Sequence, residues 1–175
     1  MIIIISGTTH TGKTNLAQKL LEKYKYPYLS VDHLKMGLIR SGNTLLTPYS
    51  SDEELSAYLW PIVSEMIKTA IENKQNLIVE GCYIPYNYKE YFSNDYLKEI
   101  RCYFLVMSTK YINNNFDNII KYESIIEKRL TTDVTKEELI NSNNDVLNNC
   151  IKYNLNYLLI DDKYEFDIEV GDYYE

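Results

Sequence analysis

The stretch that decides the fold lies near the start of the chain and reads Gly7-Thr8-Thr9-His10-Thr11-Gly12-Lys13-Thr14. It matches the pattern G-x-x-x-x-G-K-[ST] in full. Its two glycines let the backbone take conformations that a side chain would forbid, so that successive N–H groups point inward at phosphate oxygens. The lysine then reaches the β- and γ-phosphates of a nucleotide, and the threonine hydroxyl reaches a Mg²⁺ ion. The predicted contacts with ATP are Gly7, Thr8, Thr9, His10, Thr11, Gly12, Lys13, Thr14 and Asn15, with Thr14 as a Mg²⁺ ligand.

The residues on either side of this stretch have the pattern of a strand and a helix. Residues 2–5 are four isoleucines, and residues 15–24 carry leucines and a tyrosine at helical spacing. A phosphate-binding loop of this type connects a strand to a helix, whose positive end adds its dipole. The context therefore favours nucleotide binding over a structural glycine turn.

Short apolar strands alternate with longer helices along the rest of the chain. Further strands are predicted at residues 28–31, 77–79, 100–107 and 157–160, and helices at 32–40, 51–71, 109–129 and 135–153. Capping boxes open the helices at Ser51 and Thr135, and Pro61 is expected to kink or split the first of them. The acidic end from Asp161 onward predicts a solvated tail. The alternation predicts one α/β domain over residues 1–175, a sandwich of about five parallel strands.

Composition excludes several classes of protein. A formal charge of −7 argues against binding nucleic acid through a general electrostatic field. No apolar run approaches the roughly 20 residues of a membrane span, and no leader pattern precedes the first strand, which predicts a cytoplasmic protein. The three cysteines have neither disulfide nor zinc spacing and are expected to be reduced and mostly buried. The sequence carries no signature of an oligomeric state.

At this point the chain resembles the P-loop small-molecule kinases of the nucleoside-monophosphate-kinase-like group, which includes adenylate, shikimate and gluconate kinases and chloramphenicol phosphotransferases. The resemblance rests on ISGTTHTGKT at residues 5–14, SVDHLKMGLIRSG at 30–42 and LIVEG at 77–81. As a whole the chain looks like short proteins described as adenylate kinase-like or 2-phosphoglycerate kinase-like. The resemblance implies a parallel sheet in the order 2-3-1-4-5 and a small helical lid at about residues 110–132.

Three residues after the second predicted strand are candidates for the acceptor side of such a site. Asp32 occupies the place where hydroxyl-phosphorylating members of the group keep an aspartate, and a carboxylate there can take the proton of an alcohol or position the metal. The same residue can cap the helix that follows. Arg40 lies where family members bind an anionic group of the acceptor, although an arginine at a helix end also suits the helix dipole. Lys35 is a weaker candidate of the same kind.

Two further candidates come from the third strand and from the expected lid. Glu80 closes the strand at the edge where open α/β sheets bind ligands, so it can hold a metal-bound water or an acceptor hydroxyl, or simply end a buried strand. It stands where many P-loop proteins have an aspartate. Arg129 is the lid arginine that would stabilise transition-state charge, with Lys110, Lys121 and Lys128 nearby, unless it belongs to a solvated face. The predicted catalytic residues are therefore Lys13, Asp32 and Arg129.

The expected function is transfer of the γ-phosphoryl group of ATP, with Mg²⁺, to a small-molecule acceptor. One aspartate and only three arginines in the chain favour a hydroxyl acceptor over a phosphate acceptor. The alternatives are a nucleoside monophosphate kinase and a non-catalytic ATP-binding regulatory module. A kinase of polynucleotide ends is disfavoured by the acidic charge.

Overall fold

A computed structural model of the chain describes residues 1–122, 134–165 and 168. The strands are β1 (Ile2–Gly7), β2 (Tyr28–Ser30), β3 (Leu77–Glu80), β4 (Ile100–Met107) and β5 (Tyr157–Ile160). The helices are α1 (Lys13–Tyr24), α2 (Val31–Arg40), α3 (Asp52–Glu72), the short 3₁₀ helix η1 (Tyr88–Tyr91), α4 (Asn94–Lys98), α5 (Thr109–Lys121) and α6 (Lys136–Lys152). The periodicity predicted all of these except η1 and α4, which are too short to leave a periodic signal.

The five strands form one parallel sheet in the order β2-β3-β1-β4-β5, as the resemblance implied. β1 lies at the centre, with Ile5 opposite Glu80 of β3 and Tyr103 of β4. Because all strands run in the same direction, their carboxyl ends meet at one edge of the sheet. The residues that follow β1, β2 and β3 are therefore brought together there.

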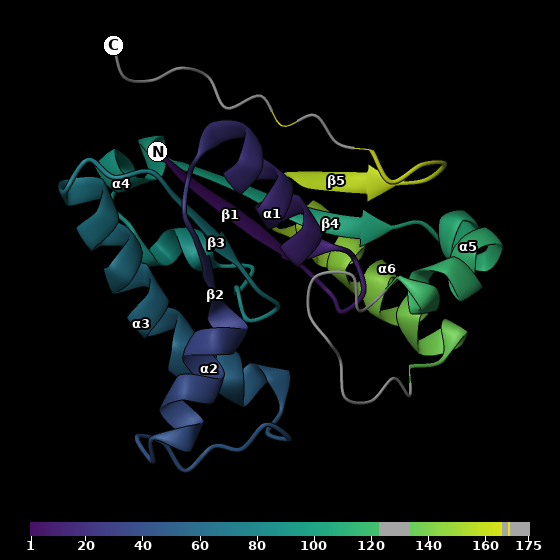
Figure 1. The fold of residues 1–175 in the computed structure, drawn as a ribbon, viewed down its shortest axis with the longest axis horizontal. Coiled ribbons are helices and arrows are strands. Elements are labelled where there is room, and N and C mark those ends of the chain that lie inside the picture. Colours follow the sequence, from purple (N-terminus) through teal and green to yellow (C-terminus); the bar gives the residue numbers. More distant parts are fainter. Residues whose placement is uncertain (123–133, 166–167, 169–175) are drawn as a thin grey trace.

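The two faces of the sheet are covered by different helices (Figure 1). Along β1, Ile2 and Ile4 pack in the core that contains α3 and one side of α6, while Ile3 and Ile5 pack against α1. Successive side chains of a strand point to opposite faces, so a run of four isoleucines fills both layers. The phosphate-binding stretch is thus attached to the most deeply buried strand.

The helix that contains Pro61 is continuous from Asp52 to Glu72, so the predicted split is wrong. Proline removes one N–H donor, which leaves the carbonyl of the residue four positions earlier without its helical partner. That residue is Ala57, which is exposed and can bond water instead. The capping boxes predicted at Ser51 and Thr135 are both confirmed, each with a glutamate side chain that accepts from the backbone N–H of the cap.

The acidic end of the chain is not simply solvated, because two of its described residues pack against the body of the protein. Ile168 is buried in the core under α1, and its carbonyl accepts a hydrogen bond of 3.0 Å from Tyr24. The Tyr164 hydroxyl donates to the carbonyl of Gly12 at 2.7 Å. The acidic composition of the segment after Asp161 gave no indication of these two contacts. Within the described residues, no helix has the length and apolar character needed to cross a membrane.

The expectation that the cysteines are mostly buried is confirmed. Cys102 and Cys150 are buried, Cys82 is half-buried, and all three are free thiols. Burial raises the pKa of both Cys102 and Cys150, so these thiols stay protonated.

Candidate active site

The loop between β1 and α1 owes its shape to three residues with positive φ angles. These are Gly7 at 130°, His10 at 64° and Gly12 at 78°. At Gly7 a Cβ atom would also lie 2.5 Å from the backbone carbonyl oxygen of Leu105, so a side chain would push the loop away from β4. Glycine is therefore required both for the conformation and for the close approach of two strands.

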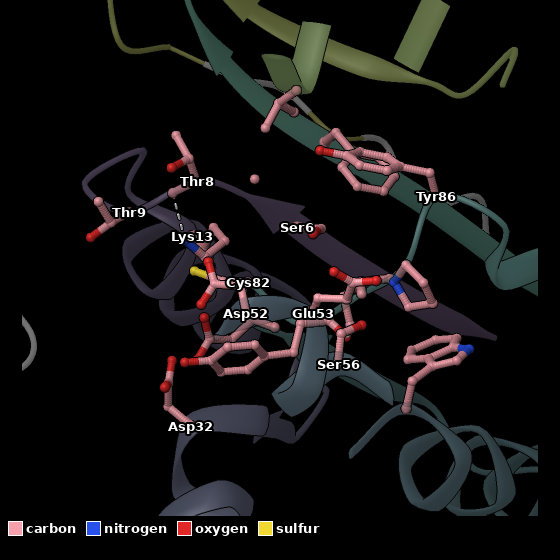
Figure 2. A pocket seen from close by; sticks show the side chains of 18 of the residues that line it. Ser6, Thr8, Thr9, Lys13, Asp32, Asp52, Glu53, Ser56, Cys82 and Tyr86 are labelled. Atoms are coloured by element: carbon pink, nitrogen blue, oxygen red, sulfur yellow. Dashed lines mark hydrogen bonds between the residues drawn. The ribbon is translucent and has the colours of Figure 1, made fainter. Parts of the chain in front are cut away.

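The loop is braced on the carbonyl oxygen of Thr8. The buried Thr11 hydroxyl and the Lys13 ammonium both donate to this oxygen, each at 2.8 Å. Figure 2 shows the bond from Lys13. The stem of Lys13 is buried, with 7% of the side chain exposed, and its amine points back over the loop that it follows. The Lys13 cation therefore lies against the loop whose backbone N–H groups the motif assigns to phosphate.

Thr14 and Glu80 come together at the carboxyl edge of the sheet. The Thr14 hydroxyl donates to Glu80 Oε2 at 3.3 Å, and Glu80 is buried with 2% exposure. Mg²⁺ in nucleotide sites takes one or two protein oxygens and completes its shell with phosphates and water. This oxygen pair fits that requirement. Among the described residues there is no cluster of three or more acidic, histidine or cysteine side chains that would hold a metal without a nucleotide.

Asp32 lies in the first turn of α2 and pairs with Lys35 instead of with Thr14. The Lys35 ammonium donates to Asp32 Oδ1 at 2.6 Å and to the Tyr83 hydroxyl at 2.7 Å. Burial lowers the pKa of Lys35, but these two hydrogen bonds outweigh that effect and the pKa is raised. Burial also raises the pKa of Tyr83. Lys35 is therefore protonated at neutral pH, and its hydrogen bond orients the Asp32 carboxylate.

The phosphate loop and Asp32 open into one cavity of about 1110 Å³. Figure 2 shows Lys13 and Asp32 at one end of this cavity and Tyr86 at the other. The cavity is lined by polar residues (Ser6, Gly7, Thr8, Thr9, Lys13, Thr14, Asp32, His33, Asp52, Glu53, Ser56, Glu80, Cys82, Asn87, Ser142 and Asp145) and by apolar or aromatic ones (Met36, Ala57, Trp60, Tyr83, Ile84, Pro85, Tyr86, Tyr91, Phe104, Val146 and Tyr153). A polar end, which contains the predicted phosphate loop, thus adjoins an aromatic end.

The structure brings together most, but not all, of the predicted site residues. Gly7, Thr8, Thr9, Lys13, Thr14, Asp32 and Glu80 line the cavity, and Lys35 supports Asp32 from behind. His10, Thr11, Gly12 and Asn15 shape the loop or begin α1 without lining the cavity. Arg40 is exposed at the end of α2 and does not line it either. Arg129 and Lys128 lie outside the described residues, as does most of the expected lid after α5.

Several lining residues were not predicted from the sequence. Asp52 and Glu53 come from the first turn of α3, and Asp145 comes from α6. The capping box at Ser51 signalled an acidic first turn but not the direction in which it faces. Of the tyrosines that follow β3, Tyr83, Tyr86 and Tyr91 line the cavity, whereas Tyr88 is in the core.

The aromatic end is built by stacking. The Tyr86 ring lies between Phe104 and Tyr153, with centroid distances of 5.5 and 6.0 Å and interplanar angles of 27° and 16°. Burial raises the pKa of the Tyr86 hydroxyl to about 12, so the ring is neutral at ordinary pH. Three elements distant in sequence therefore form one rigid aromatic wall.

The fold of the chain is similar to that of several solved structures. A shikimate kinase from Bacteroides thetaiotaomicron matches with a TM-score of 0.50 at 15% identity, over 95% of this chain and 89% of that one. This chain shares the fold of that shikimate kinase. A shikimate kinase from Aquifex aeolicus vf5 matches at 18% identity and a TM-score of 0.42, over 87% of this chain and 99% of that one. A gluconokinase from Sinorhizobium meliloti 1021 matches at 14% identity and a TM-score of 0.40, over 86% of this chain and 91% of that one. No protein-family model matches the chain, and no curated protein does.

Proposed function

We propose that the protein transfers the γ-phosphoryl group of ATP to a hydroxyl group of a small molecule. The observation that carries the proposal is the shared cavity, in which the loop lysine, a buried glutamate and an oriented aspartate lie at one end and aromatic side chains line the other. A nucleotide-binding switch needs the first part of this arrangement but has no use for the second. The fold of a P-loop small-molecule kinase is consistent with the same conclusion.

The chemistry assigns one task to each group. The acceptor oxygen forms a bond to the γ-phosphorus while the bond from that phosphorus to the β,γ-bridging oxygen breaks, and ADP leaves with the electron pair. The acceptor proton passes to the Asp32 carboxylate, which Lys35 holds in place. Lys13 offsets the charge that develops on the phosphates.

Thr14 and Glu80 are the residues that would hold Mg²⁺, in place of the Thr14 and Asp32 pair expected from the sequence. When bound, the metal neutralises phosphate charge. Asp32 is then left to act on the acceptor. A nucleoside monophosphate acceptor is the weaker alternative, because such an acceptor needs cations to offset its phosphate and Arg40 does not line the cavity.

The test is ADP release in the presence of ATP, Mg²⁺ and a panel of alcohols, sugar acids and nucleoside monophosphates. Lys13→Ala should lower turnover by about 10²–10³-fold, the usual cost of losing a group that stabilises transition-state charge. Lys19→Ala removes the same charge from the exposed side of α1 and is the matched control, expected to leave turnover unchanged. Equal turnover in the Lys13→Ala variant and in the wild type would refute the proposal.

A further inference from the structure

We propose that the acceptor is an alcohol that carries a positively charged amine and no carboxylate or phosphate group. The inference rests on the proposed function, because it names the class of molecule that enters the acceptor end of the same cavity. It departs from the expectation that Arg40 binds an anionic group of the acceptor.

The first argument is the balance of charge around the cavity. Its described lining contains one lysine, Lys13, which belongs to the phosphate loop. Five carboxylates line it: Asp32, Asp52, Glu53, Glu80 and Asp145. The roles proposed above use Asp32 and Glu80, which leaves three carboxylates facing the space where the acceptor would sit. A carboxylate or phosphate on the acceptor would meet like charges there, which is a strong discriminating effect.

The second argument is the placement of those three carboxylates. Asp52 and Glu53 stand in the first turn of α3, where negative charge is favoured by the helix dipole. Asp145 stands on α6, which packs on the same face of the sheet. Figure 2 shows Glu53 and Asp52 between the Lys13 end and the Tyr86 end of the cavity. Negative charge therefore comes from two separate helices and not from a single exposed turn.

The third argument is the set of aromatic rings that line the cavity outside the Tyr86 stack, among them Tyr83 and Tyr91. The face of an aromatic ring attracts ammonium groups through its quadrupole. The chain already uses one lining ring in this way, because the Lys35 ammonium lies 4.8 Å from the centroid of Tyr83. Rings and carboxylates in one pocket are the combination that holds an organic cation.

The test compares three compounds on one six-carbon frame: protonated glucosamine, glucose and gluconate. Turnover is followed by ADP release. Binding is followed separately by the fluorescence of Trp60, the one tryptophan of the chain, which lines the cavity. Glucosamine should bind and react best and gluconate worst, with at least about a tenfold difference in Kd and kcat/KM between them.

The double variant Asp52→Asn, Glu53→Gln should shrink this ratio to about threefold or less, because it removes two of the three charges and keeps their shape. Neither residue forms the capping box of α3, so the helix start is retained. Glu65→Gln is the control, since it removes a carboxylate of α3 that pairs with Lys68 outside the cavity. It should leave the ratio as it is in the wild type.

The outcomes separate the two proposals. Phosphorylation that favours gluconate, or treats all three alike, overturns this inference and leaves the proposed function standing. Selective binding of glucosamine without turnover of any acceptor supports the inference on the pocket and contradicts the proposed function. Absence of binding by all three compounds, or an amine preference that persists in the double variant, also overturns the inference.

Discussion

Replacing Asp32 by asparagine separates catalysis from structure at this site. The carboxylate lies in the first turn of α2, faces the cavity that holds the phosphate loop, and accepts a 2.6 Å hydrogen bond from Lys35. Asparagine keeps the size of the side chain and one accepting oxygen. It removes the negative charge and the ability to take a proton from an alcohol.

The expected effects on turnover and on stability differ greatly in size. Loss of a general base lowers turnover by about 10²–10⁴-fold, which is about 3–5 kcal/mol in the activation barrier. The Asp32 side chain is 42% exposed, so water screens its ion pair. Such a pair contributes about 0.2–1 kcal/mol to stability. At about 2–4 °C per kcal/mol for a chain of this size, the thermal midpoint should fall by no more than about 4 °C.

The assay measures ADP release, ATP affinity by calorimetry, and the thermal midpoint. The chain supplies a matched control in Asp95→Asn, because Asp95 also stands second in its helix and pairs with Lys98 at 2.8 Å, three residues on. Asp95 does not line the cavity. The control should keep full turnover. The N-cap of α2 is Ser30, so the helix-capping role expected for Asp32 is wrong. If Asp32→Asn keeps turnover within about threefold of the wild type, Asp32 serves only in its pair with Lys35 and the assignment of the base is refuted.

Three further predictions concern neighbouring residues. Thr14→Val removes the hydroxyl that donates to Glu80, so the Mg²⁺ concentration for half-maximal ADP release should rise by about tenfold. An unchanged Mg²⁺ dependence would contradict the assigned metal ligands. Gly12→Ala should lower the free energy of unfolding by about 1–3 kcal/mol, because φ is +78° and a Cβ would lie 2.7 Å from the Tyr164 ring. Gly37→Ala, in the open interior of α2, should instead raise the free energy of unfolding by about 0.5–1 kcal/mol. Urea titration measures both values, and equal effects of the two substitutions would count against the argument. Burial lowers the pKa of Lys35, but its hydrogen bonds raise that pKa by more, so the folded-state value lies above the ordinary 10.5. The stabilisation that charged Lys35 contributes is therefore complete below pH 10.5 and is lost as the pH rises through the folded-state pKa. The difference in thermal midpoint between the wild type and Lys35→Met should therefore be constant from about pH 6 to about pH 9, and a slope there would contradict this reasoning.

The order of helices and strands was predictable because its signals are local. Four isoleucines can fill two buried layers at once, and a capping box needs only four residues, so β1 and the starts of α3 and α6 could be predicted from the sequence. The phosphate loop is equally local. Its function comes from backbone geometry that two glycines permit within eight residues. The strand order followed from the resemblance and is confirmed.

The pairing of side chains between elements was decided by the tertiary structure alone. The sequence offered both Asp32 and Glu80 as carboxylates near the metal. The fold pairs Thr14 with Glu80, 66 positions away, and pairs Asp32 with Lys35, which also donates to Tyr83. Such pairings depend on how far each strand extends and how each helix is rotated.

The negative charge of the proposed acceptor pocket was also decided by the tertiary structure. The sequence by itself determined the loop motif and the strand that carries it, because the motif is contiguous and its predicted phosphate contacts come from the backbone. The charge of the pocket depends on Asp52 and Glu53 of α3 and Asp145 of α6, which share no sequence neighbourhood. They face one space because parallel strands bring their carboxyl ends to one edge and both helices pack on one face of the sheet.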